Sequence, residues 1–84
     1  MPLMFEFAQM HQAISFQLEV RRRFPQHKAD LTVQRSLTGH FLRTNGVWHD
    51  LYQPWVDVER KRDFANEREL HDLAKEFGSI GSMT

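Results

Sequence analysis

The sequence predicts a mainly α fold of the α+β type, with three or four helices and one small two-stranded β-hairpin. Apolar residues recur at helical spacing in three stretches, and a capping pattern precedes the last of them. A short alternating stretch lies between the first two. With 84 residues, the chain suffices for one small domain, expected over residues 1–78, with residues 79–84 as a flexible C-terminal tail.

The first predicted helix covers residues 4–23, which contain no glycine or proline. Its apolar stripe has residues three or four apart: Phe7, Met10, Ile14 and Leu18. From Ile14 to Val20 the same stretch also alternates with the period of a strand, but its length favours a helix. Phe24-Pro25 should end it, because a residue before proline is pushed out of the helical conformation.

The residue pattern in the middle of the chain predicts a hairpin followed by a helix. Residues 31–35 and 39–43 should pair across a turn at Gly39, giving a hairpin that needs a helix to pack on. Thr44-Asn45 offers an N-cap for an aromatic helix that extends to about Phe64. Pro54 either kinks this helix, which we favour, or divides it into one helix that ends near Tyr52 and another that begins at Pro54. The apolar stripe repeats every three or four residues: Trp48, Leu51, Tyr52, Trp55 and Val58.

The last predicted helix begins after Asn66, a capping residue followed three positions later by Glu69. Its apolar face repeats at helical spacing, and Gly78 stands where a C-terminal glycine is expected. Ten apolar residues from these elements form the predicted core: Phe7, Met10, Ile14, Leu18, Phe41, Trp48, Leu51, Trp55, Leu70 and Phe77.

Composition argues against several classes of protein. The 11 basic and 11 acidic residues cancel, whereas a dedicated nucleic-acid module usually carries a basic excess. The chain has no cysteine, which excludes disulfides, cysteine-ligated zinc and cysteine nucleophiles. We expect no signal peptide, because a charged leader and an apolar run are missing, and no membrane span. A soluble, intracellular protein is the expectation.

No pattern of residues indicates catalysis. The five histidines do not form the paired spacing of a zinc protease. His40, His49 and Asp50 could meet in space as a metal site, but exposed or hydrogen-bonded histidines explain them as well. No serine lies in a nucleophile-elbow motif, and no glycine-rich phosphate loop exists. We therefore expect a protein that is not an enzyme and has no cofactor or metal.

Two groups of residues are candidates for binding a partner. The basic group could contact phosphates or could form a solvated helix end and a polar loop: Arg21, Arg22, Arg23, Lys28 and Arg35. The aromatic group could pack in the core or anchor an interface, since tryptophan and tyrosine are enriched at binding hot spots: Trp48, Tyr52 and Trp55.

The order of several apolar and turn residues resembles a pattern in small, uncharacterised phage and prophage proteins. It covers roughly residues 16–62: Phe24-Pro25, Leu31, Arg35, Gly39, Phe41, Val47, Tyr52 and Trp55. The chain departs from it by having tyrosine at position 52, where tryptophan is commoner, and by Pro54. The resemblance implies a phage accessory gene in a bacterial cytoplasm and transfers no catalytic residue.

These observations lead to three hypotheses about function. The first is a non-enzymatic protein-binding module, a phage-encoded inhibitor that binds a host protein or defence complex stoichiometrically. The second is a small nucleic-acid-binding or regulatory protein that uses the basic stretch Arg21–Arg35. The third is a homodimer whose helices complete each other's core.

Overall fold

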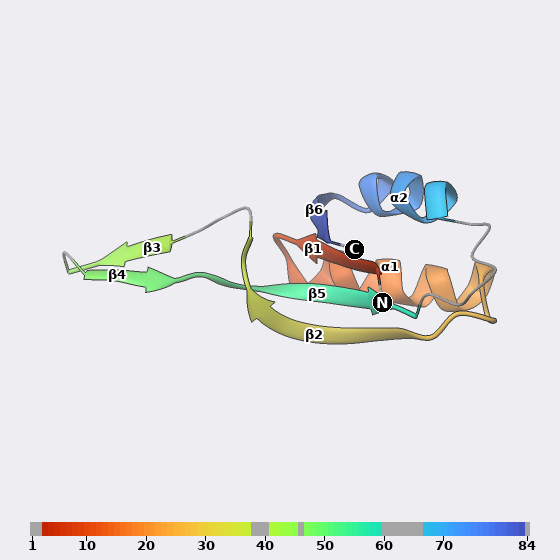
Figure 1. The fold of residues 1–84 in the computed structure, drawn as a ribbon, viewed down its shortest axis with the longest axis horizontal. Coiled ribbons are helices and arrows are strands. Elements are labelled where there is room, and N and C mark those ends of the chain that lie inside the picture. The colour runs from red at the N-terminus through yellow and green to blue at the C-terminus, as the bar shows by residue number, and fades with distance from the viewer. Residues whose placement is uncertain (1–2, 38–40, 46, 60–66, 84) are drawn as a thin grey trace.

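The structure, a computed structural model, describes residues 3–37, 41–45, 47–59 and 67–83, and of residues 41–44 and 48 it describes the backbone alone. Its elements follow one another along the chain (Figure 1): β1 (Leu3–Phe7), α1 (Met10–Arg23), β2 (Ala29–Arg35), β3 (Phe41–Thr44), β4 (Val47–Asp50), β5 (Tyr52–Val58), α2 (Glu67–Glu76) and β6 (Ser79–Met83).

Four strands form one antiparallel sheet in the order β2-β5-β1-β6, and β3 pairs with β4 in a separate two-stranded sheet. Without β3 and β4, the chain runs β-α-β-β-α-β, which is the split β-α-β or ferredoxin-like arrangement. The prediction of a mainly α fold with three or four helices is therefore wrong. The described residues form two helices and a four-stranded sheet, an α+β domain.

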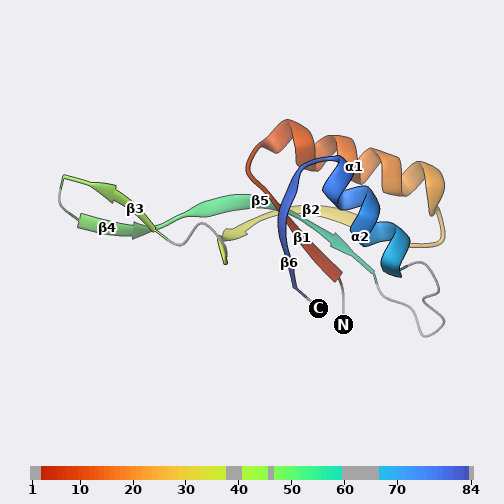
Figure 2. The same ribbon diagram turned by 90° about the horizontal axis from the view of Figure 1, so that it is seen from above.

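Both helices pack on the same face of the sheet, as Figure 2 shows from above. Alternate residues of β1 and β5 point towards the helices and pack against the apolar side of each helix. Phe16 of α1 lies at the centre, with its ring centroid 5.3 Å from those of Phe5 and of Phe7. The core consists mainly of Leu3, Phe5, Phe7, Ala13, Phe16, Val20, Val56, Val58, Leu70, Leu73 and Ala74.

The N-terminal stretch is a strand followed by a helix, not one helix over residues 4–23. The helix starts after Gln9, whose backbone N–H donates to Oε1 of Gln12 at 3.2 Å, half of a capping box. Because it starts there, its buried side is formed by Ala13, Phe16 and Val20. The predicted stripe is wrong for three residues, which are 40% or more exposed: Met10, Ile14 and Leu18.

The middle of the chain also differs from the prediction. Residues 31–35 belong to β2, which pairs with β5 from Ala29↔Val58 to Arg35↔Tyr52, so the predicted pairing of 31–35 with 39–43 is wrong. The predicted aromatic helix is wrong as well, because its described residues form β4 and β5. Three predicted core residues from this stretch have different outcomes: Trp55 is buried, Leu51 is half-buried, and the side chain of Trp48, like that of Phe41, lies outside the described part.

Pro54 fits a strand because of where pairing with β1 stops. The β1–β5 register runs from Leu3↔Val58 to Glu6↔Trp55, so Pro54 lies just beyond it. Proline has no N–H to give to a neighbouring strand, and it is tolerated where that side of the strand is unpaired. The kink that a helix would need does not arise.

The last part of the chain contains the helix that the sequence predicted. In α2 the residues Leu70, Leu73 and Ala74 are buried, and Phe77 packs partly buried against the core. Gly78 ends the helix with φ +91°, the left-handed conformation that favours glycine. The expected flexible tail instead forms β6, which pairs with β1. No helix in the described part of the chain is long and apolar enough to cross a membrane.

Candidate functional site: the projecting hairpin

The hairpin of β3 and β4 projects from the end of the sheet (Figure 1) and makes the molecule 47 Å long but only 23 and 18 Å across. We call β3, β4 and the turn between them the β3–β4 arm. Its strands pair from Phe41↔Asp50 to Thr44↔Val47. Asn45 in the turn has φ +52°, a conformation that asparagine tolerates better than most residues. Asn45 is thus a turn residue and not the N-cap of a helix.

A buried carboxylate holds the root of the arm to the sheet. Glu6 of β1 is fully buried and accepts hydrogen bonds from Ser36 Oγ at 2.6 Å and from the Leu37 N–H at 3.0 Å. The Ser36 N–H in turn donates to the Leu51 carbonyl at 2.6 Å. These bonds fix the chain where it leaves β2, so they determine the direction in which the arm starts.

Exposed apolar side chains and one ion pair lie on the arm and at its root. Tyr52 is 60% exposed and Val47 is 55% exposed. Arg35 is the register partner of Tyr52, and its Nη1 lies 3.6 Å from Oδ2 of Asp50. An exposed tyrosine beside an arginine is the composition that binding hot spots favour.

The structure separates the three aromatic residues that the sequence grouped together. Tyr52 is exposed, whereas Trp55 is 1% exposed and sits opposite Glu6 in the register, on the sheet face away from the helices. The Trp55 indole N–H makes no hydrogen bond with the described residues. Trp48 pairs with Arg43 on the arm. Of the three, Tyr52 is the one whose described side chain is available to a partner.

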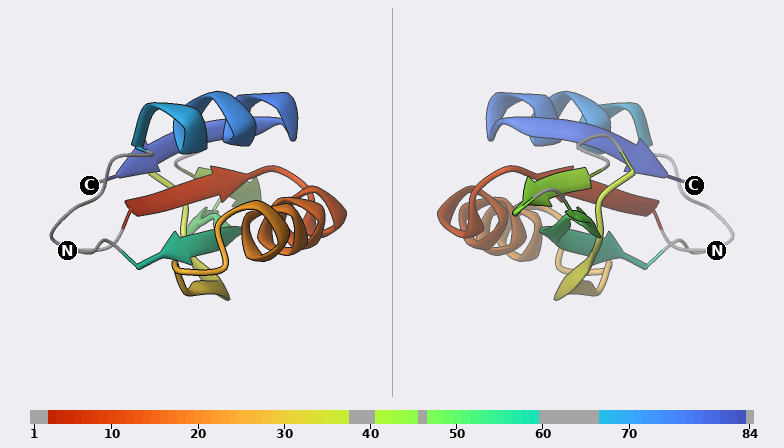
Figure 3. Two further views of the ribbon diagram at one scale, coloured as in Figure 1. Left: turned by 90° about the vertical axis from the view of Figure 1, so that its right-hand side faces the viewer. Right: turned by 90° about the vertical axis from the view of Figure 1, so that its left-hand side faces the viewer.

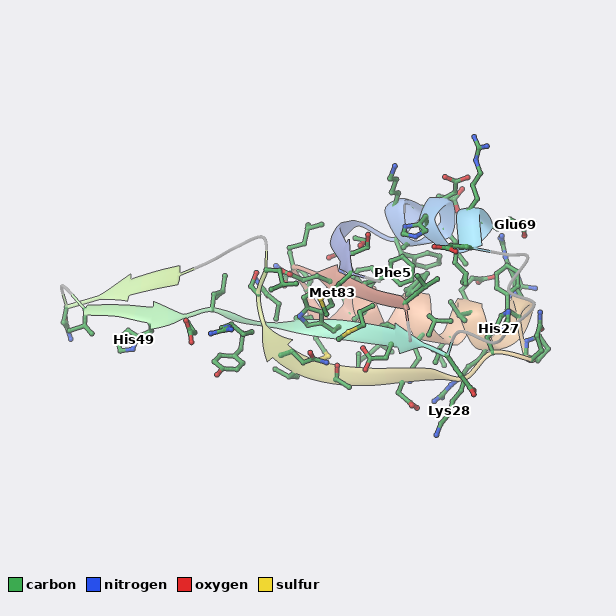
Figure 4. All side chains as sticks on the ribbon, in the orientation of Figure 1. Phe5, His27, Lys28, His49, Glu69 and Met83 are labelled. Carbon is green, nitrogen blue, oxygen red and sulfur yellow. The ribbon has the colours of Figure 1, made fainter. Side chains whose placement is uncertain are left out.

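The basic residues do not form one patch. Lys28 precedes β2 and Arg35 ends it, and Figure 4 shows Lys28 at the end of the molecule opposite His49 on the arm. Most of these side chains also form ion pairs with nearby carboxylates. Arg22 and Arg23 both pair with Glu19, and Lys28 Nζ lies 3.8 Å from Asp30.

Arg21 differs from its two neighbours in its partner. Its Nη2 donates to the Ala29 carbonyl at 3.2 Å, so it ties the end of α1 to β2. Hydrogen bonding by Arg22 to Glu19 is the main cause that lowers the pKa of that carboxyl below its ordinary value. The three arginines at the end of α1 therefore bind groups of this protein: Arg21 bonds to β2, and Arg22 and Arg23 pair with Glu19 on the same helix.

The sheet face away from the helices is acidic. Asp57 of β5 is the register partner of Asp30 on β2. Burial raises the pKa of Asp57 above its ordinary value, and the nearby charge of Asp30 raises it further. In RNA-binding domains with this strand order, exposed aromatic residues on the two central strands stack on bases. Here the corresponding positions on those strands hold Glu6 and Trp55, which are both buried. A buried tryptophan cannot stack on a base, and an acidic side chain does not attract a phosphate.

Two features of the described residues bear on metal binding and catalysis. No three histidine, aspartate or glutamate side chains among them are close enough to hold a metal ion. His49 and Asp50 are neighbours on β4 and so point to opposite sides of the arm; His40 lies outside the described part. A hollow of about 410 Å³ between α1 and α2 is lined by Arg23, Phe24, Glu69, Asp72, Leu73 and Glu76. None of its carboxylates is paired with a base in the manner of a catalytic dyad.

Sequence reasoning missed the arm and Glu6. The Asn45-Gly46 pair between alternating stretches is a strong hairpin signal and could have revealed the arm. Glu6 alternates with Phe5 and Phe7, but nothing local indicates that a glutamate will be buried. No protein-family model matches the chain, and no curated protein sequence matches it significantly.

Proposed function

We propose that this chain is a non-enzymatic protein-binding module and that the β3–β4 arm is the part that contacts the partner. The observation that carries the proposal is the projection of a two-stranded hairpin, with Val47 on the arm and Tyr52 at its root both more than half exposed. A lone pair of strands is marginally stable in water. Contact with a partner would bury these side chains and stabilise the arm.

A protein suits the arm better than a nucleic acid does. The cations at Arg22, Arg23 and Lys28 are already paired with acids, and the formal net charge is zero. Phosphate contacts need protein cations that are free to displace the counterions condensed on the nucleic acid. Exposed apolar and aromatic side chains next to an arginine are instead typical of the centre of a protein interface.

The resemblance to small phage proteins supports a more specific form of this proposal. The chain would be a phage-encoded inhibitor in the bacterial cytosol that binds a host protein or defence complex stoichiometrically. Such a role needs no catalytic residue, cofactor or metal.

Affinity purification from bacterial lysate with matched variants tests the proposal. The double variant Val47→Asp/Tyr52→Ser should lose a captured host protein that the unaltered chain retains. Leu18→Ser is the control, because Leu18 is equally exposed, at 57%, but lies on α1. The captured protein should then bind the purified chain in calorimetry at a fixed ratio.

Two results would contradict the proposal. One is a host protein that the arm variant and the control capture equally well. The other is a titration in which oligonucleotides bind the chain tightly and lose affinity steeply with salt, which would transfer the function to nucleic acid.

A further inference from the structure

The outer edge of β6 is open in the part of the chain that the structure describes. β6 is the last strand in the order β2-β5-β1-β6. Edge strands are usually protected by a charged residue, a proline or a covering element, because their free N–H and C=O groups can pair with another chain. The sequence of β6, Ser-Ile-Gly-Ser-Met, has neither charge nor proline, and Ile80 is 44% exposed.

A small hollow lies along this edge, between β6 and α2. Figure 3 shows α2 and β6 together at one end of the sheet, and Figure 4 shows Phe5 beneath α2. The hollow measures about 170 Å³, and its walls include Phe5, His71, Ala74, Lys75, Ile80 and Ser82. Small-molecule sites are usually larger, about 300–1,000 Å³. The size of this hollow suits an inserted side chain.

The residues that line this hollow include one lysine, Lys75, and no carboxylate. His71 and Lys75 are one helical turn apart on α2. Lys75 makes no ion pair with a described residue, whereas Arg22, Arg23, Lys28 and Arg35 do. The His71 ring packs edge-on against Phe5, with centroids 5.1 Å apart, so its position at the hollow is fixed.

We propose that β6 and α2 form a docking groove for an extended peptide segment of another protein, with an acidic group in that segment. The segment adds a strand to the outer edge of β6, a recognised mode of peptide binding. One apolar side chain enters the hollow against Phe5 and Ala74. A carboxylate of the segment lies beside Lys75 and His71. This groove is separate from the β3–β4 arm and requires no contact with it.

A second copy of this chain fits the groove less well than a single strand does. Because α2 lies at the β6 end of the sheet (Figure 3), two copies paired edge to edge through β6 would bring their α2 helices together. The Lys75 side chains of the two copies would then approach each other, and like charges repel. An isolated peptide strand brings no second α2 helix and no second Lys75 to the groove.

NMR titration with a defined peptide tests the groove. The probe is a synthetic peptide of alternating threonine and valine with a C-terminal aspartate and a free carboxyl group. We expect the amide signals of Ile80, Gly81 and Ser82 to shift on addition of the peptide. Those of Val47 on the arm and of Tyr52 at its root should stay in place. A version of the peptide with methylated backbone nitrogens should not bind, because it cannot donate to the edge of β6.

Two matched variants test the charge. Lys75→Glu should weaken binding of the acidic peptide about tenfold or more, the size expected for a lost charge-assisted bond. Lys28→Glu, at an exposed lysine remote from the groove, should leave the affinity unchanged. Both side chains are exposed, so both variants should fold, and thermal melting verifies this.

Four results would overturn the proposal: no signal shifts at peptide concentrations of about 1 mM, shifts confined to the arm, equal affinity of Lys75→Glu and the unaltered chain, or retained binding of the methylated peptide. Self-association of the free protein through the amides of β6 would likewise overturn it, because the occupant would then be a second copy.

Discussion

Replacement of Glu6 tests whether a buried carboxylate sets the root of the β3–β4 arm. Its side chain accepts bonds from Ser36 Oγ and from the Leu37 N–H. In Glu6→Ala the Ser36 hydroxyl loses its acceptor in a buried place and the Leu37 N–H in a partly buried one, at about 1–3 kcal/mol each. With the loss of packing included, we expect the free energy of unfolding to fall by about 3–5 kcal/mol.

Glu6→Gln should cost much less, about 1 kcal/mol. The amide oxygen can still accept from the Leu37 N–H, and the amide nitrogen can donate to Ser36 Oγ, because a hydroxyl both donates and accepts. Glu59→Gln is the control, since Glu59 is exposed and should change stability by less than about 0.5 kcal/mol.

Urea denaturation followed by circular dichroism measures these differences, and hydrogen exchange locates them. Exchange of the Leu37 amide should accelerate strongly in Glu6→Ala and slightly in Glu6→Gln. A loss of less than about 1 kcal/mol in Glu6→Ala would contradict this role of Glu6. So would a destabilised Glu6→Ala in which the Leu37 amide exchanges as slowly as before.

Three further predictions concern stability. Gly78→Ala should cost about 1–2 kcal/mol in urea denaturation, because φ is +91° there and a Cβ disfavours the left-handed conformation; an unchanged midpoint would refute this. The folded state raises the pKa of Asp57 above 3.8 and so holds that proton more tightly than the unfolded chain does. Its contribution to stability therefore grows as the pH falls through the raised pKa and is lost above it. Asp57→Asn, which removes the repulsion from Asp30, should stabilise the protein near neutral pH by about 0.2–1 kcal/mol, and thermal melts that show this gain only in acid would refute it. Trp55→Ala should cost about 3–5 kcal/mol and Tyr52→Ala less than about 0.5 kcal/mol, and comparable losses in their melts would contradict the burial of one and the exposure of the other.

The sequence predicted α2 because the signals for that helix are local. The repeat of Leu70, Leu73 and Phe77 and the glycine at position 78 lie within a few turns of one another. Such signals need no knowledge of the rest of the chain. The end of α1 at Phe24-Pro25 was predictable for the same reason.

Strands β4 and β5 were not predicted, because the same residues show both the spacing of a helix and the alternation of a strand. Trp48, Leu51, Tyr52 and Trp55 have helical spacing, yet the alternation of Pro54, Val56 and Val58 gives β5 its buried side. Pairing with β1 and β2 outweighs the helical spacing, and those pairings join residues far apart in sequence. A single sequence does not show which stretches will meet.

The candidate sites were predicted only in part. Tyr52 was singled out by residue type alone, and the structure adds its exposure on the root of the arm. Lys75 and Ile80 attracted no attention, because β6 was expected to be a tail. The groove depends on β6 folding back beneath α2, which only its pairing with β1 establishes.

The arm also bears on how the chain folds. One residue, Leu51, separates β4 from β5, whereas residues 36–40 separate β2 from β3. The β3–β4 pair therefore follows directly on the β2–β5 pair, and the chain reverses at the turn that contains Asn45. A hairpin forms in about 1–10 μs, and pairing can spread from the turn towards the sheet. The pairing of β1 with β6 joins the two ends of the chain and requires closure of a far longer loop. We therefore expect the part that projects furthest from the core to become ordered early in folding, and the two chain ends to pair last.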